Sequence, residues 1–371
     1  MDKTNMQLIA LKLESMDIPF KVAFRHSSAS RDKTETAWVT ASSNMATGYG
    51  ESCPRSYVTG EDMSSVKTFF EQYRDMLIES IHDLDSLKKW ITSHEVMIDQ
   101  SPAAWCAIEL ALLDLLAKEN QCTVEQLLGL PALQGEFTYT AVLGDSTIET
   151  YIQQVQQYAS LGLKDYKIKT TDDLALNKEK ITAIQTYIPD ARIRLDANNL
   201  WDDAAQAIEH LTPISNSIFA VEEPIQVHDW NGLGDMAKTL DIKIILDESF
   251  TNKLDLQKLL DYPQYWIVNL RVSKLGGLLR SLEYAKIAKE EGIACIVGAQ
   301  VGETSLLTRA GLIVAQNCKD NLIAQEGAFG LYLLENDICN ESLMFGKQGK
   351  LVVNDYKSLN QPGFGLSVTD L

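Results

Sequence analysis

The second half of the chain repeats a short apolar run followed by an amphipathic segment. Eight apolar or β-branched runs begin at residues 137, 166, 192, 219, 243, 266, 294 and 321, so that successive starts lie 23 to 29 residues apart. That interval suits one strand followed by one helix, and several runs are apolar throughout, which is typical of strands buried on both faces. The pattern predicts eight parallel strands that alternate with helices.

The segments between these runs carry helix signals. Residues 146–149 read Ser-Thr-Ile-Glu, a capping box, and apolar residues then follow at helical spacing until Gly162. A second helix is expected over residues 278–291, ending before Gly292. This alternation favours a closed barrel of the (β/α)₈ type. An open doubly wound sheet is the alternative, but no GxGxxG motif follows an early strand.

The first 130 residues have a different pattern. Two stretches read as strands of a hairpin-like sheet and two as helices, over residues 12–24, 35–51, 65–81 and 102–119, respectively. We therefore expect an α+β domain over residues 1–130 and a barrel domain over residues 131–344. A tail of about residues 345–371 is expected to return to the first domain.

Composition and charge narrow the class of protein. The chain has 371 residues, with 33 Lys and Arg against 51 Asp and Glu, which gives a formal net charge of −18. So acidic a chain is not expected to bind nucleic acid or an anionic membrane. No apolar stretch approaches the roughly 20 residues of a membrane span, and the start lacks a signal-peptide core. The six cysteines show no metal-site or CxxC spacing, so we expect a cytoplasmic protein.

Three acidic residues stand at the ends of successive expected strands. Asp196, Glu222 and Asp247 close the third, fourth and fifth strands, 26 and 25 residues apart. Side chains at the carboxyl ends of barrel strands point into one mouth, where three carboxylates repel unless a hard cation neutralises them. Oxygen ligands suit Mg²⁺. We therefore predict one divalent ion on these three residues, with Asn198 and Glu248 around the ligands.

Basic residues are expected on two sides of the acidic cluster. Lys167 and Lys169 share one face of the second strand, and repulsion between their ammonium groups lets one of them act as a base near neutral pH. On the sixth strand, side-chain alternation favours Arg271 over Lys274 at the mouth, although a bulge would exchange them. The five histidines fall at none of the strand ends, which argues against a His base, a Ser-His-Asp triad or a His-rich zinc site.

These motifs resemble the enolase superfamily, and within it the muconate lactonizing enzyme subgroup. The resemblance is carried by KIK, LDANN, VEEP, LDES and SKLGG at the second to sixth strands, and by GYGESCPRSYVTGE near Tyr49. It implies a modified (β/α)₇β TIM-type barrel with an α+β N-terminal capping domain. It also implies a Mg²⁺-dependent enzyme that removes the proton alpha to a carboxylate, giving a metal-stabilised enediolate. Residue by residue, the metal ligands become Asp196, Glu222 and Asp247, the base Lys169 and its neighbour Lys167.

Two positions depart from the subgroup's pattern. The subgroup usually has a second lysine five residues before the first glycine of its GG pair, where this chain has Arg271. Arginine keeps its proton and is a poor base. We therefore expect a one-base lyase or cycloisomerase, in which Arg271 stabilises the enediolate or grips a carboxylate. Dipeptide epimerases of the subgroup carry DxD on the eighth strand, whereas this chain has Gln-Glu-Gly at 325–327, and Glu326 is expected to act as a general acid or to contact substrate.

Two other functions stay open. A racemase or epimerase of dipeptides or N-acyl amino acids would use Lys274 or water as its second base, and a barrel without catalysis would only bind carboxylates. The partner is in each case a small carboxylic acid, and the family's barrels often form homo-oligomers. Capping loops and the seventh strand are expected to contact the substrate, through Arg25, Arg31, Arg55, Tyr57, Gln300 and Glu303.

Overall fold

The computed structural model describes residues 6–26 and 29–369, without the side chains of residues 22–30. Its largest element is a parallel sheet of eight strands in the order β14-β13-β12-β11-β10-β9-β8-β7. The strands are β7 (Ala141–Leu143), β8 (Asp165–Lys169), β9 (Arg192–Asp196), β10 (Ala220–Glu222), β11 (Lys243–Leu246), β12 (Trp266–Leu270), β13 (Ala294–Val297) and β14 (Leu322–Gln325). Neighbours in space are thus neighbours in sequence, which excludes the doubly wound alternative.

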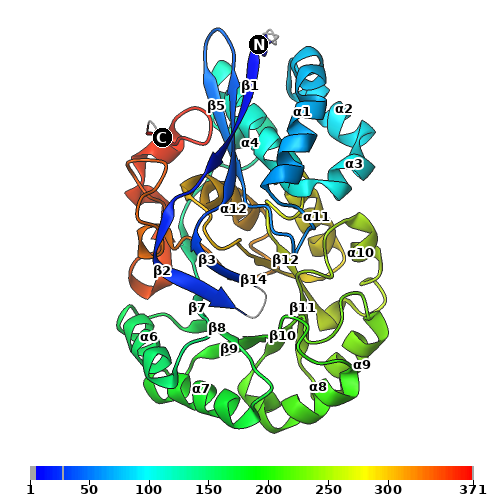
Figure 1. Ribbon diagram of the computed structural model, residues 1–371, viewed down its shortest axis with the longest axis vertical. Coiled ribbons are helices and arrows are strands. Elements are labelled where there is room, and N and C mark those ends of the chain that lie inside the picture. Colours follow the sequence, from blue (N-terminus) through cyan, green and yellow to red (C-terminus); the bar gives the residue numbers. More distant parts are fainter. Residues whose placement is uncertain (1–5, 27–28, 370–371) are drawn as a thin grey trace.

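Seven helices connect these strands and lie outside them (Figure 1). They are α6 (Ile148–Ser160), α7 (Leu174–Tyr187), α8 (Ala204–Leu211), α9 (Trp230–Leu240), α10 (Lys253–Gln257), α11 (Leu278–Glu290) and α12 (Ser305–Asn317). A hydrogen bond of 2.8 Å from the amide of Thr140 to the carbonyl of Gln325 joins the β7 side of the sheet to the β14 side. The expected modified (β/α)₇β barrel is therefore confirmed.

Side-chain alternation explains the barrel interior. A small apolar cluster, separate from the main core, contains Ala220, Ile245, Ile267, Ile296 and Ala324, contributed by five adjacent strands. These residues fill the middle of the barrel, and their neighbours along each strand face the helices.

One local expectation, on the start of α6, is wrong. The capping box of residues 146–149 does not form, because Thr147 is the N-cap of α6 and accepts a hydrogen bond from the amide of Thr150.

An α+β capping domain packs on the barrel, in the upper part of Figure 1. Its three-stranded antiparallel sheet has the order β1-β4-β5, and β2 pairs with β3. The strands are β1 (Ala10–Met16), β2 (Pro19–His26), β3 (Ala29–Lys33), β4 (Thr36–Ser42) and β5 (Thr47–Ser52). The single strand expected over residues 12–24 is divided before Pro19, because proline lacks the amide hydrogen and restricts the residue before it.

The helices of the capping domain surround α4, which is buried along nearly its whole length. The helices are α1 (Met63–Ser80), α2 (Leu84–Ser93), α3 (Glu95–Gln100), α4 (Pro102–Glu119) and α5 (Val124–Leu128). Gly48 and Gly50 of β5 let the sheet approach α4, since a Cβ on either would lie closer than 3.0 Å to the carbonyl oxygen of Ala111 or Ala107. The approach seals the core of this domain.

Two buried carboxylates of the capping domain hold helices of the barrel. Glu51 accepts hydrogen bonds from the amide and hydroxyl of Thr304 (2.9 and 2.6 Å) and from the amide of Leu307 (3.1 Å), at the start of α12. Glu109 accepts one from the amide of Leu279 (2.9 Å), at the start of α11. Helix N-termini carry free amide donors, so these carboxylates fasten the two parts together.

The chain beyond the barrel contacts both parts. Strand β15 (Lys350–Val352) pairs antiparallel with β6 (Glu136–Thr138), and the amide of Phe364 donates to Asp114 of α4 at 2.8 Å. The division at residues 130 and 344 stays a prediction. None of the described helices is long and apolar enough to cross a membrane.

Candidate active site

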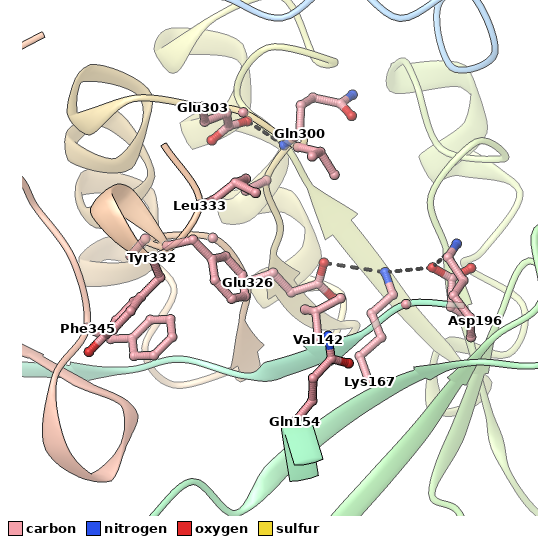
Figure 2. A pocket seen from close by; sticks show the side chains of 18 of the residues that line it. Val142, Gln154, Lys167, Asp196, Gln300, Glu303, Glu326, Tyr332, Leu333 and Phe345 are labelled. Carbon is pink, nitrogen blue, oxygen red and sulfur yellow. Dashed lines mark hydrogen bonds and ion pairs between the residues drawn. The ribbon is translucent and has the colours of Figure 1, made fainter. Parts of the chain in front are cut away.

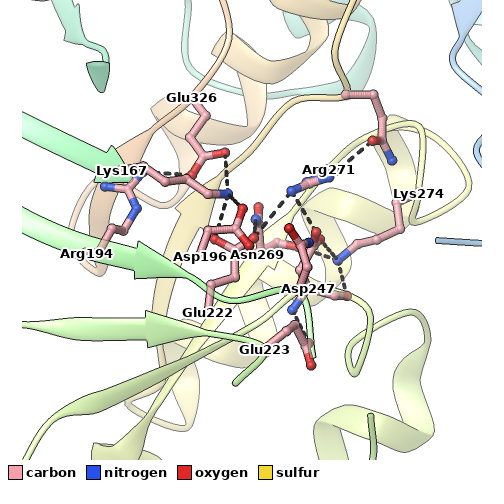
Figure 3. Close-up of polar contacts among 12 residues, drawn as sticks. Lys167, Arg194, Asp196, Glu222, Glu223, Asp247, Asn269, Arg271, Lys274 and Glu326 are labelled. Carbon is pink, nitrogen blue, oxygen red and sulfur yellow. Dashed lines mark hydrogen bonds and ion pairs between the residues drawn. The ribbon is translucent and has the colours of Figure 1, made fainter. Parts of the chain in front are cut away.

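The three predicted carboxylates converge at the carboxyl ends of β9, β10 and β11 (Figure 3). Glu222 is the register partner of both Asp196 and Ile245. Asp247 lies two residues after Ile245, which faces the barrel interior, so alternation brings Asp247 to the same mouth. All three side chains are buried. Each is paired with a lysine or arginine, which offsets the repulsion among them.

Lys167 lies at the centre of this charge cluster. Its Nζ is 2.7 Å from Glu222, 3.1 Å from Asp196 and 3.4 Å from Glu326. Burial lowers the pKa of Lys167, but the three carboxylates outweigh burial and raise it above the ordinary value. The same burial raises the pKa of Glu222. Repulsion between the two lysines therefore does not control Lys167, and the expectation that it favours loss of this proton is wrong.

Lys169 is the more accessible of the two lysines and lines the cavity described below. Its Nζ is 2.8 Å from Asp196 and also donates to the side-chain oxygen of Asn198. Asn198 has a positive φ of 45°, a conformation that asparagine tolerates better than most residues. Asn198 therefore positions the predicted base.

Arg271 and Lys274 both reach Asp247. Arg271 Nη2 lies 2.6 Å from Asp247 and 3.4 Å from Glu222, and the guanidinium lines the cavity. Lys274 is fully buried and donates to the carboxylate and carbonyl of Asp247 (2.9 and 2.7 Å) and to the carbonyl of Asn269 (2.8 Å). The structure thus places Arg271 rather than Lys274 at the mouth. Lys274 instead holds Asp247 and the backbone of Asn269 in place.

Glu326 stands across the mouth from Asp247, beside Lys167. It accepts a hydrogen bond of 2.8 Å from Arg194, a buried residue of β9. Burial raises the pKa of Glu326, but Lys167, Arg194 and Arg271 outweigh burial and lower it. The side chain is held as a carboxylate, which suits contact with a donor group better than the role of general acid. Sequence reasoning missed Arg194, although alternation in RIRLD puts it on the face of Asp196.

The donor set fits a hard divalent cation. Oxygen Oδ1 of Asp196 and Oε2 of Glu248 are buried without a hydrogen-bond partner, and oxygen ligands of this kind are those that Mg²⁺ prefers. Glu223, the neighbour of Glu222, accepts from the amides of Asp247 and Ser249 at 2.6 and 2.8 Å and so fixes the end of β11. Within the described ranges, no three acidic, histidine or cysteine side chains form a group that could hold a metal ion as they stand.

The capping-loop arginines have mostly structural partners. Arg55 is buried, and its guanidinium donates to the carbonyls of Thr34, Glu35, Pro54 and Val301 at 2.7 to 3.3 Å. It clamps the capping domain to the loop after β13, and the structure therefore contradicts its expected role in binding substrate. Of the other predicted substrate contacts in these loops, Arg31 is paired with Glu35 and Tyr57 lines the cavity. The side chain of Arg25 lies outside the described residues.

The seventh-strand candidates lie at the cavity as expected. The side-chain oxygen of Gln300 accepts a hydrogen bond of 3.1 Å from Arg271, and the backbone N–H of Gln300 donates to Glu303 at 2.6 Å. Burial raises the pKa of Glu303 to about 8. Both side chains line the same cavity as Lys169. Figure 2 shows them above Glu326 and Lys167.

This cavity has a volume of about 340 Å³ and extends well beyond the charged cluster. Its far part is aromatic, and sequence reasoning missed that part entirely: Tyr158, Phe329, Tyr332 and Phe345. Phe345 and Tyr332 lie in segments without a strong strand or helix pattern, so no periodicity placed them at the site.

The sequence of the barrel also matches a known protein family. A family model described as enolase C-terminal domain-like matches residues 150–370, which include every strand of the barrel from β8 to β14. The chain belongs to the enolase superfamily. Among relatives of this superfamily member, the L-amino acid-D/L-Glu epimerase of Francisella philomiragia is 26% identical over 317 residues, covering 84% of this chain and 88% of the relative.

Two further relatives are a racemase and an epimerase. The N-succinyl-L-Arg/Lys racemase of Bacillus cereus is 25% identical over 321 residues, covering 84% of each chain. The structure of a dipeptide epimerase from Enterococcus faecalis, complexed with Mg and the dipeptide L-Leu-L-Tyr, has a TM-score of 0.83 at 24% identity, covering 98% of this chain and 100% of that chain. This superfamily protein is an enzyme, and its relatives favour the epimerase or racemase alternative over the expected lyase or cycloisomerase and over a barrel without catalysis.

Proposed function

We propose that the protein is a Mg²⁺-dependent epimerase or racemase that acts on the carbon alpha to the carboxylate of a dipeptide or N-acylated amino acid. The observation that carries the proposal is the convergence of Asp196, Glu222 and Asp247 with Lys169, whose Nζ is 2.8 Å from Asp196. The names of the relatives supply the substrate class.

A divalent cation would be held by Asp196, Glu222 and Asp247, whose oxygens now contact Lys167, Arg271 and Lys274. When bound, such a cation stabilises the negative charge that develops on a substrate carboxylate. The alpha proton beside a carboxylate is very weakly acidic, so charge stabilisation and a positioned base are both needed.

Lys169 accepts the alpha proton at Nζ. Asn198 orients its side chain, and its accessibility from the cavity allows contact with the substrate. Lys167 keeps its charge among three carboxylates and contributes a fixed positive field beside the reacting carbon. Arg271 lies on the opposite side of the mouth and stabilises the developing negative charge.

Epimerisation also requires a proton for the opposite face. Burial lowers the pKa of Arg271, but Asp247 and Glu222 outweigh burial and raise it above the ordinary value, so the guanidinium does not release a proton. Lys274 already donates to three oxygens. We propose that a water molecule beside Arg271 delivers the second proton, and that the hydroxide left behind is neutralised through solvent by the proton that Lys169 took up.

The presence of Arg271 favours a second candidate, a one-base lyase or cycloisomerase. Such a reaction removes and returns protons on one face only, so Lys169 suffices. The two candidates differ in what solvent deuterium does. Incubation in D₂O with N-succinyl amino acids and dipeptides, followed by chiral chromatography and mass spectrometry, should show deuterium in both epimers. Deuterium in the starting epimer alone would reject the epimerase and support a one-face reaction.

The assigned base has its own test. Lys169→Ala should lower kcat by about 10²- to 10⁴-fold, the usual contribution of general-base catalysis, while Mg²⁺ binding by calorimetry stays intact. The matched control is Lys164→Ala, an exposed lysine that precedes β8 and pairs with Asp190. Activity near the wild-type value in Lys169→Ala would remove Lys169 from the mechanism.

A further inference from the structure

The cavity that contains Lys169 extends beyond the charged cluster. Besides Val142 and Glu326, residues of α6 and of the segment 327–345 line it. We call this part of the cavity the side chamber and define it by its lining residues Tyr158, Leu161, Phe329, Tyr332, Leu333 and Phe345. Figure 2 shows Tyr332 and Phe345 on one side of Glu326 and Lys167 on the other.

The barrel geometry aims a substrate toward this chamber. The carboxylate cluster lies on β9 to β11, and Lys169 and Arg271 flank the mouth at the ends of β8 and β12. In an eight-stranded ring the strand opposite β10 is β14, which adjoins the seam with β7, where Glu326 and Val142 stand. Val142 pairs in register with Lys167 and so faces inward. A group that points away from the reacting carboxylate therefore enters the seam.

The walls of the side chamber are aromatic and uncharged. Phe345 packs edge-to-face on Phe329, with ring centroids 5.3 Å apart, and its ring centroid lies 5.2 Å from that of Tyr332. Burial raises the pKa of the Tyr158 hydroxyl to about 12, in keeping with apolar surroundings. No charged side chain belongs to the six residues that define the chamber. Such walls favour a flat or bulky apolar group.

Two polar side chains that line the cavity lack a hydrogen-bond partner. The side-chain oxygen of Gln154 is buried without a hydrogen-bond partner, and so is the hydroxyl of Ser146; both residues line the cavity. A buried acceptor without a donor is costly, and an amide N–H of a ligand would satisfy it. A ligand with an amide bond between the reacting carbon and the apolar group would therefore suit Gln154 and Ser146.

We propose that the side chamber binds an aromatic or large apolar acyl group, linked by an amide to the reacting carbon, and that Tyr332 selects for it. The position of the reacting carbon rests on the proposed function. Tyr332 is suited to this role because its ring packs in a tilted arrangement against Phe345, yet the residue remains 42% exposed. Specificity for this part of the substrate then comes from residues 327–345 and α6 rather than from the capping loops.

The test compares two ligands that cannot react, because their alpha carbon has no hydrogen: N-phenylacetyl and N-acetyl 2-aminoisobutyric acid. Calorimetry with Mg²⁺ should give at least about ten-fold tighter binding of the phenylacetyl ligand, as burial of an aromatic ring predicts. Tyr332→Ala should reduce this preference to about three-fold or less. Tyr262→Ala, at an exposed tyrosine stacked on Tyr265 away from the cavity, should leave it unchanged.

Equal binding of both ligands by the wild-type protein, binding of neither, or an unchanged preference in Tyr332→Ala would overturn the assignment of the side chamber. Failure of the proposed function would be seen separately. A clear preference in binding, without turnover of N-phenylacetyl amino acids that carry an alpha proton, would retain the chamber and reject the epimerase.

Discussion

At the scale of single residues, the identity of position 271 has the largest effect on the chemistry. The guanidinium is held by Asp247 and Glu222 on one side and by Gln300 on the other. A lysine there would be shorter and able to lose its proton. In the proposed mechanism the chain therefore has a base on one face, through Lys169, and a fixed positive charge on the other.

Arg271→Lys should create a proton donor on the second face. We expect faster deuterium entry into the product epimer, by about ten-fold, since a general acid contributes at least that much. The measurement is the rate of isotope incorporation in D₂O by mass spectrometry. Arg192→Lys, at the opposite end of β9 from the site, is the matched control and should change nothing. An Arg271→Lys rate below that of the wild type would show that the guanidinium itself is required.

The sequence predicted the charged cluster because strand ends follow a simple rule. Asp196, Glu222, Asp247, Lys167 and Lys169 all follow from the strand interval and side-chain alternation. The partners of Arg55 did not follow, because they are backbone carbonyls of its neighbour Pro54 and of two distant segments, at residues 34–35 and 301. A bond to a main-chain atom leaves no trace in the identity of the residue that provides it.

At the scale of elements, the barrel strands were predictable and the irregular segments were not. Each barrel strand begins within a few residues of an expected apolar run, apart from the first. That run, from residue 137, is divided into β6 and β7, and β6 pairs with β15 rather than with the barrel. The aromatic wall from residue 327 to 345 has turns and no long element, so its position depends on tertiary contacts alone.

The contact of β5 with α4 gives an element-scale test. Gly50→Ala should destabilise the protein by about 3 kcal/mol, because its Cβ would overlap the backbone of Ala107 and cores tolerate added atoms poorly. Urea unfolding measures the change. Gly234→Ala, in α9, is the control: the nearest atom to its Cβ is 3.9 Å away, in Trp266, and alanine should be neutral or slightly stabilising. Equal stability of Gly50→Ala and wild type would show that the helix can move away.

At the scale of the whole molecule, the two parts are joined by buried carboxylates as well as by apolar packing. Burial raises the pKa of Glu51 and of Glu109 to about 7, despite the hydrogen bonds that each accepts. Both groups lie where the capping domain meets a helix N-terminus of the barrel. The junction is thus sensitive to proton binding near neutral pH.

Glu51 makes this sensitivity testable. Its pKa is about 7 in the folded state against an ordinary 4.5, so between these values the native form binds a proton that the unfolded form does not. Its contribution to stability is full below pH 4.5 and is lost as pH rises through 7. Relative to Glu51→Gln, wild-type stability in urea should fall by roughly 2 kcal/mol between pH 5 and 8. If the difference in stability between wild type and Glu51→Gln stayed constant over this range, Glu51 would bind the same number of protons in the folded and the unfolded protein.

The charged cluster and the side chamber are built largely from different parts of the chain, which meet near the seam between β7 and β14. The three predicted metal ligands and Lys169 lie at the ends of β8 to β11, whereas the side chamber is bordered by α6 and by chain that follows β14. Replacements or length changes beyond Glu326 in that later chain would reshape the side chamber without moving Lys169, Asp196, Glu222 or Asp247. Under the proposed assignment, new acyl preferences can therefore arise here while the residues proposed to transfer protons keep their positions.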